Sequence, residues 1–184
     1  MSLEQLASDM QNCNRCTLSE GRNKLVFGNG NPQAKLMLIG EGPGKDEDEQ
    51  GMPFVGRAGQ LLDKILAAID LAREQVFIGN VVKCRPPNNR VPTKLEVAAC
   101  LPYLYRQIEL IQPKIIVLLG STALQNLIGP EARITKMRGQ WLETQSGILI
   151  MPTFHPAAVL RDPNKRRPVW EDFQKVQEEY LRLG

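Results

Sequence analysis

The sequence predicts an α/β protein of three layers, α/β/α, with helices on both faces of a central, mainly parallel four-stranded sheet. Four short apolar runs, near 36–40, 76–80, 115–119 and 148–152, have the length and composition of buried strands. Segments of helical periodicity separate these runs, and such alternation favours parallel strands joined by crossover helices. No repeat or low-complexity linker divides the 184 residues, so we expect a single domain over residues 1–184.

Helices are predicted between and after the strands. Helical periodicity and capping residues predict them over residues 2–11, 61–69, 93–110, 121–128 and 168–183. The helix at 93–110 has the clearest start, because Thr93 and Glu96 have the spacing of a capping box. The apolar triplet 25–27 is expected to add a short strand, and most of the acidic run 46–49 to be a solvated surface.

The composition excludes several classes of protein. Hydrophobic residues make up 42% of the chain and charged residues 23%, as in ordinary globular proteins. No segment approaches the roughly 18 consecutive apolar residues of a membrane span. The first ten residues lack the basic and apolar regions of a signal peptide, so a cytoplasmic protein is expected. The net charge of +3 neither requires nor excludes a polyanionic partner.

Four cysteines form a candidate metal site. Cys13 and Cys16 are close together in the sequence, Cys84 is on a polar, proline-rich loop, and Cys100 is within the helix predicted from Thr93. In a reducing compartment, a Cys-x-x-Cys pair is more typical of a metal or redox site than of a disulfide. Four thiolates can hold zinc or an iron–sulfur cluster. The absence of a second Cys-x-x-Cys pair favours the cluster, with zinc as the alternative.

A glycine-rich loop, Gly-Glu-Gly-Pro-Gly at residues 40–44, follows the first long strand. It differs from the dinucleotide-binding fingerprint, because its third glycine comes one residue early and Pro43 removes a backbone donor. The acidic residues that follow would repel phosphate. A loop with so few side chains lets a flat ligand approach the backbone closely.

Polar side chains follow the predicted strands. Glu41, Asn80 and His155, which is the single histidine, come at or just after three strand ends. The carboxyl ends of parallel strands share one edge of a sheet, where α/β proteins bind ligands. Phe54, between Pro53 and Gly56, suits either a core position or a platform on which a ring stacks.

These motifs together resemble the family 4 uracil-DNA glycosylases. The resemblance rests on residues 40–44, residues 51–56 (GMPFVG), Asn80, the four cysteines and residues 155–161 (HPAAVLR). It covers nearly the whole chain and implies a uracil-DNA glycosylase-like fold. It also implies a monomeric DNA repair enzyme that hydrolyses the N-glycosidic bond of uracil in double-stranded and possibly single-stranded DNA. A four-iron, four-sulfur (4Fe-4S) cluster on Cys13, Cys16, Cys84 and Cys100 is implied as well.

The chemistry of uracil fits these residues. A base must be flipped out of the duplex before its glycosidic bond can be reached, and Phe54 would stack on the flipped ring. Asn80 can donate to uracil O4 and accept from N3–H, whereas cytosine presents the reverse pattern. His155 would donate a hydrogen bond to O2, where the charge of the departing uracil anion collects.

The water that attacks the sugar needs an orienting group. Related families have an acidic or amide residue in the first motif where this chain has Gly42, which we expect to contact uracil. Glu41 and Glu47 are the available carboxylates. We expect Glu47 to orient the water and Glu41 to maintain the geometry of the pocket.

The segment after His155 is expected to bind DNA. Leu160 is the candidate apolar wedge for the vacated base stack, and Arg161 would contact a phosphate. Arg161, Lys165 and Arg166 belong to a basic cluster, for which a solvated surface is the alternative interpretation.

Other functions explain fewer of these residues. One alternative is a relative that traps uracil-DNA without turnover and carries an inserted basic loop with a histidine. Residues 83–93 of this chain contain no histidine, which favours turnover. A non-catalytic iron–sulfur module that only binds DNA would not need Asn80 and His155. A redox or zinc-binding protein would explain the cysteines alone.

Overall fold

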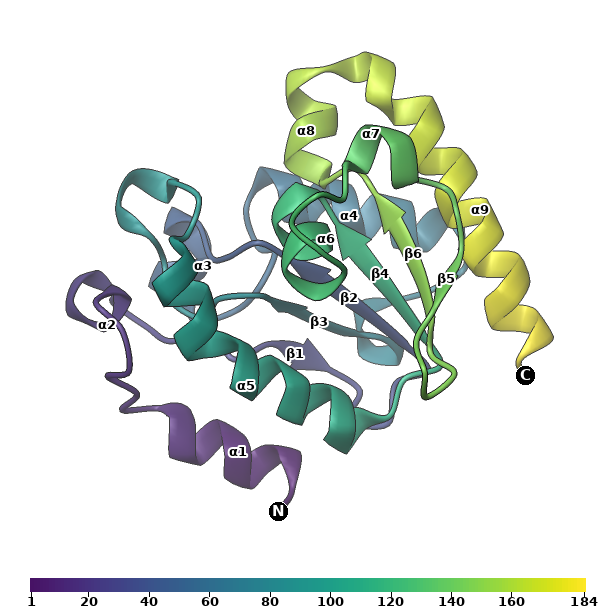
Figure 1. The fold of residues 1–184 in the computed structure, drawn as a ribbon. Coiled ribbons are helices and arrows are strands. Elements are labelled where there is room, and N and C mark those ends of the chain that lie inside the picture. Colours follow the sequence, from purple (N-terminus) through teal and green to yellow (C-terminus); the bar gives the residue numbers. More distant parts are fainter.

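The computed structural model describes residues 1–184 and has one six-stranded sheet at its centre (Figure 1). The strand order is β1-β3-β2-β4-β6-β5. The four inner strands are parallel to one another and are β2 (Leu36–Gly40), β3 (Phe77–Asn80), β4 (Ile115–Leu119) and β6 (Leu149–Thr153). These are the four strands predicted from the sequence. Their residues are almost all buried, which is why each reads as a continuous apolar run.

The two outer strands were not predicted. They are β1 (Asn29–Gly30), antiparallel to β3, and β5 (Leu142–Glu143), antiparallel to β6. Each has two residues, too few to show a period in the sequence. The expected strand at 25–27 is wrong: Leu25 and Val26 are buried against the core, but the triplet forms no ladder.

Helices cover both faces of the sheet (Figure 1). They are α1 (Leu3–Met10), α2 (Leu18–Gly21), α3 (Lys45–Gln50), α4 (Arg57–Ala68), α5 (Lys94–Ile111), α6 (Ser121–Leu127), α7 (Ile134–Met137), α8 (Pro156–Arg161) and α9 (Arg166–Arg182). Short 3₁₀ helices occur at η1 (Arg73–Gln75), η2 (Pro87–Asn89) and η3 (Pro163–Lys165). None of the helices combines the length and the apolar character that crossing a membrane requires.

Two hydrophobic clusters show the three layers. Side chains of α1, α5 and α6 pack with one face of the sheet, represented by Met37 and Ile39 of β2. Side chains of α4, α8 and α9 pack with the opposite face, represented by Leu36 and Leu38. Alternate residues of one strand therefore enter different clusters, as the pleat of a strand requires. The expected α/β/α arrangement is confirmed.

The predicted helices are present with shifted ends. The capping box that starts α5 is confirmed, since Thr93 Oγ1 accepts from the amide of Glu96 at 3.2 Å and the Glu96 carboxylate accepts from the amide of Thr93 at 2.9 Å. Gly120, with φ of +94°, caps α6 in place of Ser121. The acidic run forms α3, and its Asp48 is buried, where it accepts from the backbone and side-chain nitrogens of Asn23. Asp46 and Glu49 are exposed, as expected for most of the run, and Asp48 is its buried exception.

Candidate active site

A cleft of about 740 Å³ opens beyond the carboxyl ends of the parallel strands. Glu41 after β2, Asn80 at the end of β3, Thr122 after β4 and His155 after β6 all line it. The structure therefore brings Glu41, Asn80 and His155 together, as expected from the direction of the strands. Phe54, from the loop before α4, lines the same cleft.

His155 is fixed between β6 and α8. Its Nδ1 accepts a hydrogen bond from the amide of Ala157 at 3.0 Å, so the proton of the neutral ring is on Nε2. The pKa of His155 is lowered to about 4, chiefly by burial and also by positive Arg161, whereas negative Glu47 acts in the opposite direction. The ring is therefore neutral near pH 7 and has one N–H to donate.

Asn80 carries an unsatisfied acceptor. Its side chain is 2% exposed, and Oδ1 is the one buried side-chain polar atom with no hydrogen-bond partner. Buried polar atoms are almost always paired, so such an atom indicates a missing partner. The paired residue of the neighbouring strand is Gly40, where a Cβ would lie 2.7 Å from Asn80 Oδ1 and 2.7 Å from Phe54 Cζ. Position 40 must therefore be a glycine for the Asn80 and Phe54 side chains to pack against this strand end.

Phe54 has an unusual backbone conformation. Its φ is +52°, in the left-handed region, which costs a bulky residue about 1 to 3 kcal/mol. Its ring is stacked on His155, with 5.4 Å between ring centroids and 26° between planes. The side chain is 6% exposed and also packs in the core. The core position considered for Phe54 is therefore confirmed, whereas its role as a platform for a base stays a prediction.

The two carboxylates of the cleft have different partners. Glu47 accepts hydrogen bonds from the backbone amides of Gly44, Val55 and Gly56 at 3.0, 2.9 and 2.8 Å. It therefore joins the glycine loop to the loop that carries Phe54. Glu41 accepts a hydrogen bond from the hydroxyl of Thr122 at 2.6 Å through Oε2.

Gly42 also lines the cleft, and its surroundings explain why it has no side chain. A Cβ at this position would lie 2.8 Å from Cγ2 of Val82. The acidic or amide side chain that related families have here would therefore not fit without a shift of Val82.

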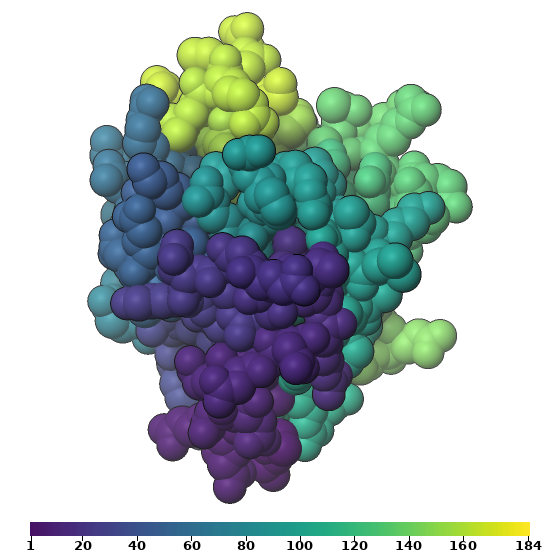
Figure 2. Space-filling model, turned by 90° about the vertical axis from the view of Figure 1, so that its left-hand side faces the viewer, coloured from purple at the N-terminus to yellow at the C-terminus, as the bar shows by residue number.

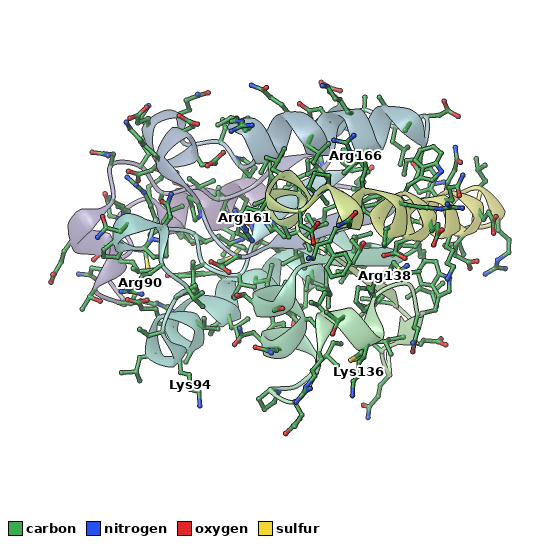
Figure 3. The ribbon with its side chains drawn as sticks, turned by 90° about the horizontal axis from the view of Figure 1, so that it is seen from above. Arg90, Lys94, Lys136, Arg138, Arg161 and Arg166 are labelled. Carbon is green, nitrogen blue, oxygen red and sulfur yellow. The ribbon has the colours of Figure 1, made fainter.

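The predicted DNA-binding residues lie at the rim. Arg161 and Lys165 line the cleft, whereas Leu160 and Arg166 are exposed outside its lining. Figure 3, which views the molecule from above, labels Arg161 and Arg166 together with the cationic residues Arg90, Lys94, Lys136 and Arg138. Lys165 is paired with Asp162, at 3.0 Å between Nζ and Oδ2, so part of its charge is offset locally.

Sequence reasoning missed several residues of the cleft. Thr122 follows β4, so the strand-end rule that located Glu41 and His155 could have found it. The wall formed by Pro86, Asn89, Arg90 and Val91 comes from a loop with no such signal.

A second cavity is lined by all four cysteines. Cys13 and Cys16 lie in the turn after α1, Cys84 in the loop after β3 and Cys100 on α5. Figure 2 shows the N-terminal segment, in purple, lying against the teal surface formed by later parts of the chain. No three of the thiols are close enough together to ligate a single ion.

Polar groups converge on these thiols. Arg22 donates to Cys84 Sγ at 3.4 Å and to the carbonyl of Cys13 at 2.6 Å, and the Tyr103 hydroxyl lies 3.6 Å from Cys13 Sγ. Burial raises the pKa of the Cys84 thiol and raises that of Cys100 to about 11. Loss of these protons therefore requires a compensating positive charge, such as that of bound metal.

Comparison with known proteins agrees with this geometry. The family model of the uracil DNA glycosylase superfamily matches residues 27–175. A type-4 uracil-DNA glycosylase of Sulfurisphaera tokodaii is 46% identical over 96% of this chain and 84% of its own length. One from Thermotoga maritima is 46% identical over 95% of this chain and 93% of its own length. The chain therefore belongs to the type-4 uracil-DNA glycosylases of the uracil DNA glycosylase superfamily.

Proposed function

We propose that the protein flips uracil out of DNA, hydrolyses its N-glycosidic bond and leaves an abasic site, the first step of base excision repair. The observation that carries this proposal is the unpaired, buried Oδ1 of Asn80 at the end of β3. Uracil N3–H would supply its missing partner, and the amide nitrogen of Asn80 would donate to O4. Cytosine has an acceptor at N3 and a donor at C4, so it would leave both groups unpaired.

Phe54 and His155 complete the recognition of the base. Phe54 lines the cleft, and the flipped pyrimidine would stack on its ring. The Nε2–H of neutral His155 donates to O2 as the bond to the sugar breaks, which stabilises the uracil anion. The hydrogen bond from Ala157 and the lowered pKa of His155 support this role. Together they give a neutral ring whose proton is on Nε2, so the ring can donate without first being protonated.

Glu41 and Glu47 are the two candidates for orienting the attacking water. Glu47 is occupied by backbone amides on both of its oxygens. Glu41 uses Oε2 for Thr122 and has Oε1 free to accept from a water. These hydrogen bonds favour the opposite division of roles from the one expected from the sequence: Glu41 orients the water, and Glu47 positions the pocket loops. Gly42 lets the base approach the backbone of the first loop.

DNA binding is assigned to α8 and the start of α9. Leu160 is exposed on α8, five residues beyond His155, where an apolar side chain can enter the space that the flipped base leaves. Arg161, Lys165 and Arg166 would contact phosphates around it. All of these residues come from one chain, so a monomer suffices for activity.

A 4Fe-4S cluster is the group that we assign to the cysteine cavity. Each iron of such a cluster takes one thiolate, so the four thiols need not converge on a single point. The arrangement of one close cysteine pair and two later cysteines, one on a loop and one on a helix, also favours a cluster over zinc. Arg22 and the fully buried Lys83 line the same cavity and would place positive charge beside the four thiolates. The cluster has no step in the hydrolysis proposed here.

The proposal is tested with a labelled oligonucleotide that contains one uracil, followed by alkali, which cleaves abasic sites. The wild-type protein should act on many substrate molecules per enzyme and leave the matching cytosine oligonucleotide intact. Asn80→Ala removes both contacts to the base and should lose about 2 to 4 kcal/mol, a factor of roughly 30 to 1000 in kcat/KM. His155→Ala should lose most of the activity.

The outcomes separate the competing functions. A stable protein–DNA adduct in place of turnover would identify a relative that traps its substrate. DNA binding without any cleavage would identify a non-catalytic module, and wild-type cleavage by Asn80→Ala would refute the recognition scheme. Iron and sulfide analysis of the purified protein tests the cluster separately, since Cys84→Ser should lose the brown chromophore.

A further inference from the structure

Arg73, on η1, binds the backbone of the loop that carries Phe54. Its Nη1 donates to the carbonyl of Pro53 at 2.9 Å, and its Nη2 donates to the carbonyl of Phe54. The carbonyl of Gly59, in the first turn of α4, lies 3.5 Å from the same Nη2. Nε is paired with Asp63 of α4. One guanidinium therefore joins η1, the Phe54 loop and α4.

The backbone of Phe54 needs such external support. A phenylalanine does not favour the left-handed conformation that it has here, with φ of +52°. The loop is pressed closely against α4, since a Cβ on Gly59 would lie 1.8 Å from the Phe54 carbonyl oxygen. The conformation is therefore maintained by contacts with neighbouring segments and not by the preference of the residue itself.

We propose that Arg73 is a positioning residue that holds Phe54 in this conformation and so sets the surface on which the base stacks. The planar guanidinium has several N–H donors in a fixed, forked geometry, so it can donate hydrogen bonds to the carbonyls of two neighbouring residues at the same time. The ring of Phe54 is thereby directed over Gly40 and against His155. That the base stacks on this ring rests on the proposed function; the positioning of the ring does not.

The test uses the fact that His155 is the only histidine in the chain. Its imidazole protons give the only histidine signals in the NMR spectrum, and the stacked Phe54 ring shifts them by its ring current. Phe54→Ala defines the position of these signals without the ring. Arg73→Met should move them from the wild-type position toward that of Phe54→Ala. Lys64→Met, on the exposed side of α4, is the control and should leave them unchanged.

Activity provides a second readout. With uracil-containing DNA in a single-turnover assay, Arg73→Met should slow cleavage, and Phe54→Ala should slow it at least as much. In the double variant, the two losses should not multiply, because both act through one ring. Wild-type His155 signals in a folded Arg73→Met protein would overturn the proposal, as would losses that multiply.

The design separates this proposal from the proposed function. If the wild-type protein did not cleave uracil-DNA, the glycosylase assignment would fail while the NMR comparison would still decide the role of Arg73. If Arg73→Met does not fold, Arg73→Lys replaces it. The lysine can keep the charge pair with Asp63 but lacks the fork, so the His155 signals should still move, and unmoved signals would refute the proposal.

Discussion

The amide nitrogen of Ala157 lies 3.0 Å from Nδ1 of His155 and donates a hydrogen bond to it. The first turn of α8 thereby determines which nitrogen of the ring carries the proton. His155 is also the cap residue of that helix, so the same backbone that ends β6 and starts α8 orients the ring. The tautomer on which the donor role proposed for His155 depends is in this way fixed by local secondary structure.

This arrangement predicts how stability changes with pH. The pKa of His155 is lowered to about 4 in the folded protein from an ordinary value near 6.5, so below pH 6.5 the unfolded chain binds the proton more readily. The contribution to stability is full above pH 6.5 and is lost progressively as the pH falls toward 4. It amounts to at most about 3 kcal/mol. Chemical denaturation of wild type and His155→Asn at pH 7 and pH 4.5 should show a larger loss for wild type.

An NMR titration of the His155 ring checks the cause directly. Its midpoint should lie near 4, and a midpoint near 6.5 would contradict both the stability prediction and the neutral donor proposed for catalysis. Because the ring stays neutral between pH 7 and 5.5, its protonation should cause no loss of glycosylase activity over this range.

Gly40 is predicted to be intolerant of any side chain. In Gly40→Ala, the new methyl group would lie 2.7 Å from both Asn80 Oδ1 and Phe54 Cζ. The shift that this forces should destabilise the protein by about 1 to 3 kcal/mol and should lower kcat/KM for uracil-DNA. Thermal unfolding and single-turnover kinetics measure the two effects.

Gly21→Ala is the matched control for this substitution. Gly21 ends α2, and no atom lies within 4 Å of the position that its Cβ would take. Its replacement should leave activity unchanged and stability equal or slightly higher. Equal behaviour of the two variants would show that the packing of Asn80 and Phe54 over β2 does not govern the site.

Glu41 and Glu47 should respond differently to loss of their charge. In Glu47→Gln, one carboxylate oxygen becomes an NH₂ group that cannot accept from the amides of Val55 and Gly56 or of Gly44, so we expect a loss of about 1 to 3 kcal/mol in stability. In Glu41→Gln, the amide can still bond to Thr122, so stability should be kept while the single-turnover rate falls. Denaturant titration and cleavage kinetics on both variants separate the two roles. A stable Glu47→Gln that loses its rate, beside an active Glu41→Gln, would restore the assignment expected from the sequence.

The sheet and the positions of its end residues could be predicted from the sequence for a physical reason. Parallel strands buried on both faces leave continuous apolar runs, such as 115–119, and their carboxyl ends must share one edge. The sequence therefore predicts that Asn80 and His155 lie at the same edge of the sheet. The two-residue strands β1 and β5 could not be found, because so short a pairing is set by its neighbours and not by its own residues.

Hydrogen bonds between side chains and backbone atoms could not be predicted from the sequence either. Arg73 binds the carbonyl of Pro53, 20 residues away, and nothing in a pattern of side chains indicates such a bond. Glu47 and Asp48 belong to one acidic run, yet one joins two pocket loops and the other is buried against Asn23. Composition describes the run as a charged surface, and only the path of the backbone reveals which of its carboxylates are enclosed.

The basic cluster after α8 is predicted to bind phosphates with unequal contributions. Arg166 is exposed and has no carboxylate partner, whereas Lys165 is paired with Asp162 at 3.0 Å. Each phosphate contact releases condensed counterions, so removing one should lower the slope of log K against log salt concentration by about 0.9. Arg166→Ala should approach this value, and Lys165→Ala should fall short of it because its charge is already partly offset. Arg182→Ala, at the far end of the same helix, should leave the slope unchanged. Fluorescence anisotropy on a uracil-containing duplex between 50 and 300 mM salt measures all three, and a wild-type slope for Arg166→Ala would remove this residue from the DNA interface.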